Sequence, residues 1–228
     1  MTALERIRGV IAGRPVDRLP AQPLIMMYAA RHVGMKYIDY TRDGLKMARA
    51  QLRLWRDYGI DCLMTCSDPA REVIDIAGEG SVDWFEDQGP AINEERAALL
   101  DKRRLKTMRV PDPLGGGRMH DRVKAIAAMR REAGPGMSIV GWVEGPLALA
   151  AELRGLSNLM VDLADDPGFV ADLLDFTAEV AIRYAPAQIE AGADTIGMSD
   201  AAACMIGPRY YDEFLFPRQR RVLESIKR

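Results

Sequence analysis

Two stretches of this chain, far apart in the sequence, share one plan, and that repeat constrains the fold more than any other feature. "GIDCLMTCSDP" (59–69) and "GADTIGMSDAA" (192–202) each run from a glycine and an acid through a short apolar segment to a Ser-Asp pair. A helical pattern precedes both stretches, so each is typical of a helix end, a glycine turn and a strand. The repeat predicts βα units, whose strands lie parallel in one sheet.

Strand and helix alternate through the rest of the chain as well. Apolar strands are predicted at 19–27, 60–68, 136–146 and 193–201, and helices at 2–12, 42–59, 118–131, from about 147, at 165–192 and from 207 onward. Residues 71–77 and 81–87 alternate apolar with polar side chains around "GEG", which predicts a two-stranded excursion after the second strand.

Continuous apolar strands between helices are typical of a parallel sheet that is covered on both faces. We therefore predict the α/β class, of the (β/α)8 TIM-barrel type. A complete barrel has eight strands and takes roughly 250 residues. We expect residues 1–228 to form one barrel domain, truncated at its C-terminus, that holds about the first four βα units.

Charge and composition exclude several classes of protein. The formal net charge is −2, from 31 basic and 33 acidic residues, which gives no electrostatic case for binding nucleic acid or a membrane surface. The N-terminal twenty residues carry charge throughout and lack the apolar centre of a signal peptide. We expect a cytoplasmic protein in which Cys62, Cys66 and Cys204 are reduced thiols.

Three acids stand where predicted strands end, and this is where α/β folds place their binding sites. Asp68 and Asp200 complete the two Ser-Asp pairs, and Glu144 ends the strand in "GWVEGP". We predict that these three carboxyl groups are catalytic and converge on one cleft. Each also has a purely structural interpretation: Asp68 and Asp200 as helix caps, and Glu144 as the partner of an arginine.

At this point the order of segments resembles the uroporphyrinogen decarboxylase family, which includes corrinoid-linked methyltransferases. The resemblance is carried by "ALERIRGVIAGRPVDRLP", "GIDCLMTCSDP", "EGPLALAAELRG" and the long match from "QIEAGADTIGMSD" to "RRVLESIK". It implies the barrel fold and makes Asp68 the counterpart of the cleft aspartate. We also predict that Arg31, His32, Ser67, Ser199 and Tyr210 bind substrate.

Two departures from the decarboxylases favour the methyltransferase branch. The arginine-rich run that follows their first strand reads "MYAAR" here, so only Arg31 remains to hold a substrate with eight carboxylates. Glu152 stands near the position of an expected tyrosine, and an acid there would repel a polyanion. The resemblance therefore implies methyl transfer between a corrinoid and a small thiol, methoxy or methylamine-type substrate. Porphyrinogen decarboxylation and a non-catalytic half barrel stay open as alternatives.

The resemblance also bears on cofactors and partners. Methyltransferase relatives bind zinc through a His-x-Cys pair and a later cysteine, and this chain contains no His-x-Cys, so we identify no metal ligand within residues 1–228. Zinc would require C-terminal ligands absent from this chain. A corrinoid is implied as a substrate or as the group of a partner corrinoid protein, and pairing as a homodimer is implied as well.

Overall fold

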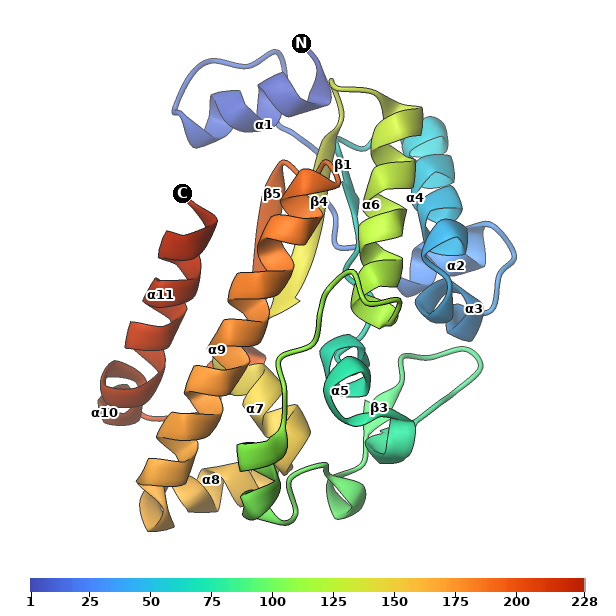
Figure 1. The fold of residues 1–228 in the computed structure, drawn as a ribbon. Helices are drawn as coiled ribbons and strands as arrows, with labels where there is room; N and C mark the ends of the chain where they lie inside the picture. Colours follow the sequence, from blue (N-terminus) through green and yellow to red (C-terminus); the bar gives the residue numbers. More distant parts are fainter. Residues whose placement is uncertain (228) are drawn as a thin grey trace.

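A three-stranded parallel sheet lies at the centre of the computed structural model, which describes residues 1–227 (Figure 1). Its strands β1 (Cys62–Met64), β4 (Ser138–Glu144) and β5 (Thr195–Ser199) lie in the order β1-β4-β5. In the register of β4 and β5, Glu144 lies beside Ser199, so both strands end together. The predicted α/β class with a parallel sheet is confirmed.

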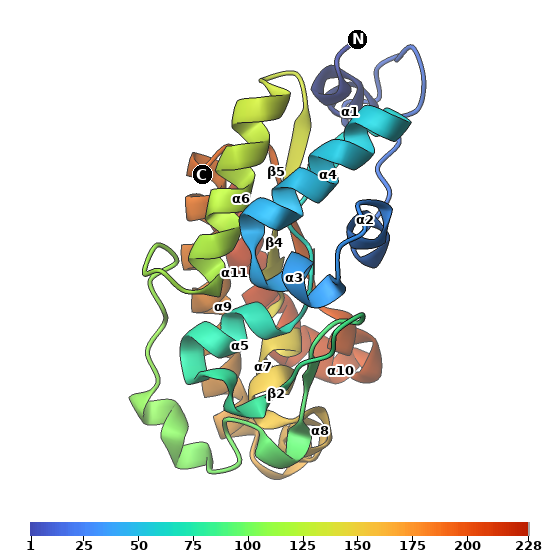
Figure 2. The same ribbon diagram turned by 90° about the vertical axis from the view of Figure 1, so that its right-hand side faces the viewer.

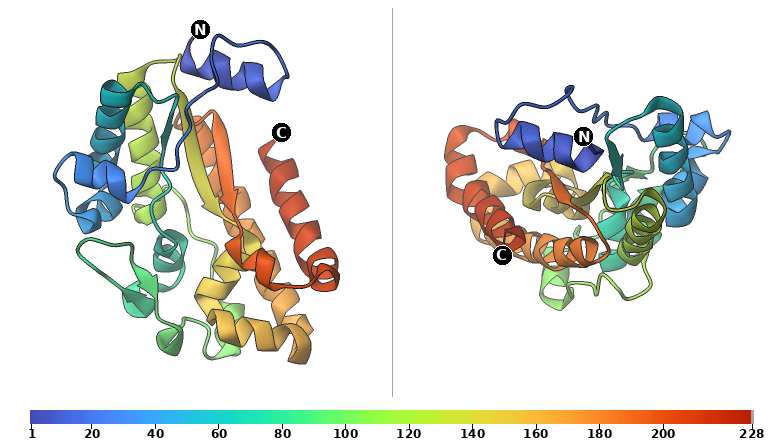
Figure 3. Two further views of the ribbon diagram at one scale, coloured as in Figure 1. Left: turned by 180° about the vertical axis from the view of Figure 1, so that it is seen from behind. Right: turned by 90° about the horizontal axis from the view of Figure 1, so that it is seen from above.

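Helices α4 (Gly44–Tyr58), α6 (Arg118–Ala133), α9 (Pro167–Glu190) and α11 (Phe216–Ile226) form an arc outside the sheet (Figure 3). Their ends follow capping rules: Asp43 accepts hydrogen bonds from two N–H groups at the start of α4, and Gly59 ends that helix with φ 62°. Asp166 caps α9, and α9 is continuous through Pro186. Apolar side chains between this arc and the sheet form the core.

The two similar stretches of sequence start their strands in the same way. Asp61 accepts a hydrogen bond from the backbone N–H of Ala21 at 2.7 Å and ion pairs with Arg6 and Arg18. Asp194 likewise accepts one from the N–H of Ile139 at 3.0 Å, and it pairs with an arginine of α6. In both units the acid after the glycine joins the beginning of its strand to a neighbouring segment.

The two ends of the sheet are covered differently. Helix α1 (Ala3–Ile11) crosses the end at which the strands begin (Figure 1). At the carboxyl end lie α5 (Ala70–Ala77), α7 (Pro146–Arg154), α8 (Leu156–Asp165) and the hairpin of β2 (Val82–Asp83) and β3 (Ala91–Ile92) (Figure 2). The short α-helices α2 (Met27–His32), α3 (Tyr37–Arg42) and α10 (Pro208–Tyr210) lie in the connections between these elements.

The prediction of a first strand at 19–27 is wrong. The segment is irregular up to Met26, and α2 begins at Met27. Pro20 and Pro23 have no N–H to donate to a ladder, which disfavours a strand inside a sheet. The segment still runs beside β1, because the N–H of Asp61 donates to the carbonyl of Ala21.

The predicted pairing of 71–77 with 81–87 is also wrong. Residues 71–77 belong to helix α5, and the observed hairpin pairs β2 with β3. Pro69 and the side chain of Asp68, which accepts a hydrogen bond from the N–H of Ala70, start the helix. These start signals outweigh the short alternation of apolar residues.

Within residues 1–227, no helix combines the length and apolar character that a membrane crossing requires.

Candidate functional site

A cavity of about 430 Å³ opens at the carboxyl ends of the three parallel strands. Its walls are formed mainly by apolar and acidic side chains, which include Met26, Trp142, Asp68, Glu144, Glu152 and, at the end of β5, Ser199. A second cavity of about 320 Å³ adjoins it and shares Ala148, Glu152 and Ala201. Together, the two cavities form one acid-lined cleft.

The charge of the cleft has one sign. Its lining includes the carboxyl groups of Asp68, Glu94, Glu144 and Glu152. No lysine, arginine or histidine among residues 1–227 lines either cavity. Such a surface attracts cations and repels anions.

Asp68 is buried and held by cations behind the cleft wall. Arg118 binds both of its carboxylate oxygens, at 2.7 and 3.0 Å, and Arg122 lies 3.9 Å away. The hydroxyl of Ser67 donates to the same carboxylate at 2.6 Å. Burial raises the pKa of Asp68, but the charge and hydrogen bonds of Arg118 outweigh it and lower the pKa to about 2. Asp68 is thus a fixed negative charge that also caps α5.

The pKa of Glu144 is shifted in the opposite direction to that of Asp68. Its Oε1 accepts a hydrogen bond from Nη2 of Arg71 at 3.0 Å, and Arg71 also lies 3.4 Å from Glu72. One guanidinium group therefore serves two carboxylates. Burial, which Arg71 only partly offsets, raises the pKa of Glu144 to about 7. Glu144 is a group that gains and loses a proton near neutral pH.

Glu152 lies one helical turn beyond Ala148 on α7 and lines both cavities. Its Oε2 is buried and has no hydrogen-bond partner among residues 1–227. Burial and the neighbouring charges of Glu144 and Glu72 raise the pKa of Glu152 well above its usual range. The protonated acid is therefore the form that this empty cleft favours.

Asp200 is directed at helix α7. Its Oδ1 accepts a hydrogen bond from the N–H of Ala148 at 2.7 Å, and its Oδ2 accepts one from Gln219 of α11 at 2.8 Å. Its neighbours Ser199 and Ala201 line the larger cavity, whereas Asp200 itself is not among the lining residues. The structure thus brings the three predicted acids to the same end of the sheet, each with a protein partner.

Ser67 and Ser199 line the cleft with the acids, but three other predicted residues lie elsewhere. Arg31 is exposed on α2. His32 was expected to contact substrate; instead its Nε2 lies 2.6 Å from Asp57, and its ring packs beside Tyr58 in a separate surface cavity. Residues 27–32 form a helix, where a strand followed by a loop was expected, and the side chain of His32 therefore turns toward Asp57 and Tyr58 of α4.

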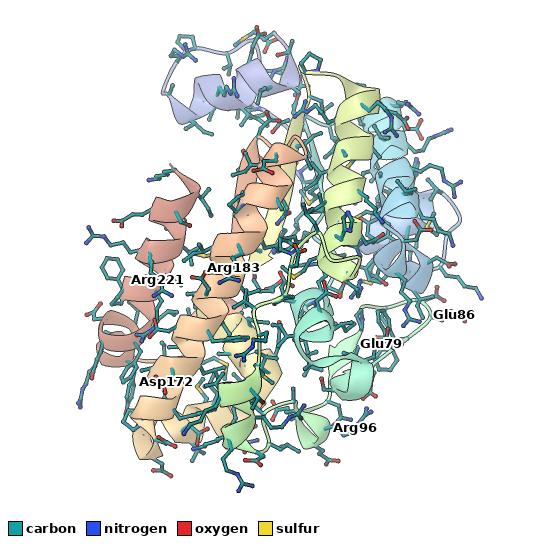
Figure 4. The ribbon with its side chains drawn as sticks, in the orientation of Figure 1. Glu79, Glu86, Arg96, Asp172, Arg183 and Arg221 are labelled. Atoms are coloured by element: carbon teal, nitrogen blue, oxygen red, sulfur yellow. The ribbon has the colours of Figure 1, made fainter. Side chains whose placement is uncertain are left out.

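Tyr210 also lies outside the set of residues that line the cleft; it packs against Phe214. Figure 4 labels charged side chains on the outer surface of the fold: Glu79, Glu86, Arg96, Asp172, Arg183 and Arg221.

Several residues of the cleft escaped the sequence interpretation. Trp142 precedes Glu144 by two positions on β4, so the alternation of a strand places both side chains on the cleft side. Tyr37 lines the cleft and donates a hydrogen bond to the carbonyl of Ser67 at 2.5 Å. The strand alternation would have identified Trp142, whereas no local pattern signals Arg118 or Tyr37.

The described residues do not fit a zinc site. Among residues 1–227, no group of three or more histidine, cysteine or acidic side chains is arranged to hold a metal ion. Cys66 lines the cleft, but burial raises the pKa of its thiol to about 11, which disfavours the thiolate that zinc requires. No step through a metal follows from these side chains.

Known proteins resemble the chain along its whole length. The profile of the family described as uroporphyrinogen decarboxylase (URO-D) matches residues 2–228. The methylcobamide:CoM methyltransferase MtbA of Methanosarcina mazei is 26% identical over 232 residues, covering 99% of this chain and 67% of that protein. The uroporphyrinogen decarboxylase of a Nostoc species is 29% identical over 236 residues, covering 98% of this chain and 65% of that protein.

A solved structure supports the same fold. A methyltransferase from Methanosarcina mazei superposes with a TM-score of 0.88 at 24% identity, over 99% of this chain and 67% of that one. This chain therefore spans about two thirds of the length of the relatives that it matches.

Proposed function

This chain belongs to the uroporphyrinogen decarboxylase family, and from that premise we propose that it serves methyl transfer between a corrinoid (methylcobamide) and a small thiol, methoxy or methylamine-type substrate. We further propose that residues 1–228 are one domain comprising about the first four βα units of a TIM-type barrel. The TM-score of 0.88 against a methyltransferase that is about half as long again supports this arrangement. A corrinoid protein as partner and pairing as a homodimer belong to the same proposal.

One observation carries the choice of methyl transfer over porphyrinogen decarboxylation. The cleft is lined by four carboxyl groups and, within residues 1–227, by no lysine, arginine or histidine. A porphyrinogen with eight carboxylates requires fixed cations, and the acids would repel it. Trp142 and Met26 give the larger cavity apolar walls, which suit a neutral or weakly polar substrate.

The residues of the cleft suggest how a thiol substrate is handled. The sulfur atom must lose its proton as it forms the bond to the methyl carbon, while the bond between that carbon and the corrinoid breaks and the demethylated corrinoid leaves with the electron pair. An unperturbed cysteine-like thiol has a pKa of about 8.5. Glu144, with a pKa of about 7, is ionised in part at neutral pH and takes that proton. Asp68 keeps its negative charge throughout and holds Arg118 in place behind the wall.

The test is a pair of assays on the 228-residue chain. Methylcobalamin is mixed with a series of small thiols, methoxy compounds and amines, and the change in corrinoid absorbance is followed together with the mass of the methylated product. Uroporphyrinogen is supplied separately, and loss of its carboxylates is followed by chromatography. We expect methyl transfer, and a decrease on the order of 10²-fold for thiols in Glu144→Gln, the effect of losing a general base.

The control is Glu179→Gln, which changes an exposed acid of α9 that pairs with Arg183 and should leave the rate unchanged. Decarboxylation without methyl transfer would assign the alternative reaction. If neither methyl transfer nor decarboxylation is detected, the result would favour a non-catalytic half barrel. Equal rates in Glu144→Gln and the unmodified chain would remove Glu144 from the mechanism.

A further inference from the structure

The acid-lined cleft holds more negative groups than its surroundings neutralise. Five other acids, each on a different segment, surround Glu152: Asp68, Glu72, Glu94, Glu144 and Asp200. Three arginines lie behind these acids: Arg71, Arg118 and Arg122. Arg118 and Arg122 are committed to Asp68 and to Asp121. Arg71 is shared by Glu72 and Glu144.

Residues 1–227 supply no partner to the Oε2 of Glu152 or of Glu72, and of these two acids Glu152 is the one that lines the cleft. Glu94, the other acid of the smaller cavity, accepts the N–H of Leu156 at 3.0 Å. Asp200 accepts the N–H of Ala148. A buried carboxyl oxygen without a donor costs about 1–3 kcal/mol, so a donor that the protein lacks would bind there favourably.

The wall around Glu152 suits one class of donor. Trp142 contributes an aromatic ring to the same cavity, and aromatic faces attract cations. Met26 and Met27 supply polarisable apolar surface. Since no basic side chain of residues 1–227 lines either cavity, an anionic ligand would find no cationic partner in the cleft wall.

We propose that the acid-lined cleft is a binding site for an organic ammonium group, in which the carboxylate of Glu152 accepts N–H hydrogen bonds from the cation. Before a ligand binds, burial and the neighbouring acids raise the pKa of Glu152 and favour its protonated form. When an ammonium ligand enters, Glu152 releases its proton to solvent and the ion pair forms in its place. The site is thus selective for the charge of its ligand, and this selectivity does not depend on methyl transfer being the reaction.

The test compares three ligands of similar shape and different charge: benzylammonium, benzyl alcohol and phenylacetate. Binding to the 228-residue chain is measured by isothermal titration calorimetry at pH 6, 7 and 8, in buffers of different ionisation enthalpy. We expect benzylammonium to bind at least tenfold more tightly than benzyl alcohol, and phenylacetate more weakly than both. We also expect its affinity to rise with pH, with release of up to one proton per ligand.

Two variants separate the role of Glu152 from a general loss of structure. Glu152→Gln keeps the shape of the side chain and should lower benzylammonium affinity at least tenfold, remove the proton release and leave benzyl alcohol binding unchanged. Glu179→Gln, which changes an exposed acid of α9 outside the cleft, is the control and should leave benzylammonium affinity unchanged.

Tighter binding of phenylacetate, or equal benzylammonium affinity in Glu152→Gln and the unmodified chain, would overturn the proposal. None of these binding experiments contains a corrinoid. A preference for the cationic ligand is therefore measured independently of methyl transfer.

Discussion

Arg118, the first residue of α6, binds both carboxylate oxygens of Asp68, fifty positions earlier in the chain, at 2.7 and 3.0 Å. The same carboxylate accepts the N–H of Ala70 and so starts α5. One acid at the end of β1 therefore fixes two helices and one wall of the cleft. The functional and structural interpretations of Asp68 describe the same set of contacts.

Without Arg118, the buried negative charge of Asp68 would lose its nearest cationic partner. We expect Arg118→Ala to lower the free energy of unfolding by about 3 kcal/mol, the low end for a broken buried pair, because Arg122 remains nearby. Urea unfolding at pH 7 measures the change. Arg103→Ala, which removes an exposed guanidinium group paired with Asp101, is the matched control and should change stability little. Equal losses in both variants would contradict the assigned role.

The low pKa of Asp68 predicts how stability depends on acid. The folded value of about 2 lies below the ordinary value of about 3.9, so the ionised form stabilises the fold. This contribution, about 2–3 kcal/mol, is present above pH 4 and is lost as pH falls toward 2. The difference in unfolding free energy between the unmodified chain and Asp68→Asn should shrink over that interval. A difference that stays constant from pH 5 to pH 2 would count against it.

Glu144 predicts a pH dependence of the opposite sign. Its folded pKa of about 7 lies above the ordinary value of about 4.3, so the protonated form is the one that the fold favours. Stability from this group is present below about pH 4 and is lost as pH rises through 7, by up to about 4 kcal/mol. Relative to Glu144→Gln, the unmodified chain should therefore become less stable between pH 4.5 and pH 8. Urea unfolding at both pH values measures the difference, and an unchanged difference would refute the assignment.

The shape of the cleft depends on a glycine beside its tryptophan. Gly197 lies opposite Trp142 in the register of β5 and β4, and a Cβ at this glycine would lie 2.5 Å from the indole ring. Gly197→Ala should displace the ring, cost about 1–3 kcal/mol of stability and weaken benzylammonium binding. Gly168→Ala, on α9 with no atom near the new Cβ, is the control and should be neutral or slightly stabilising. Identical behaviour of the two variants would show that the close contact carries no cost.

Asp200 should matter for stability through its oxygen atoms. Asp200→Ala removes the acceptor for the N–H of Ala148 and for Gln219, and we expect a loss of about 1–2 kcal/mol. Asp200→Asn keeps an acceptor oxygen for the helix and should lose less than half of that amount. Thermal or urea unfolding of the two variants measures the contrast. If alanine and asparagine cost the same, the capping role is wrong.

Local patterns in the sequence predicted much of the framework. Helices α4, α6 and α9 and strands β1, β4 and β5 follow from apolar periodicity, capping residues and glycine stops. The failures have local causes too. Prolines made the segment at 19–27 irregular, and the Asp68-Pro69 start signal made 71–77 a helix where alternation suggested a strand.

By itself the sequence determined which side chains stand at the ends of the parallel strands, because strand polarity and the turn after each strand are encoded within a few residues. Only the tertiary structure decided what each acid became: Asp68 a fixed charge, Glu144 a group that titrates near neutrality, and Glu152 a buried acid with an oxygen left unpaired. The reason is physical. The pKa of a buried carboxyl group depends on burial and on cations such as Arg71 and Arg118, which lie 73 and 50 positions away from their partners and are brought into contact only by packing.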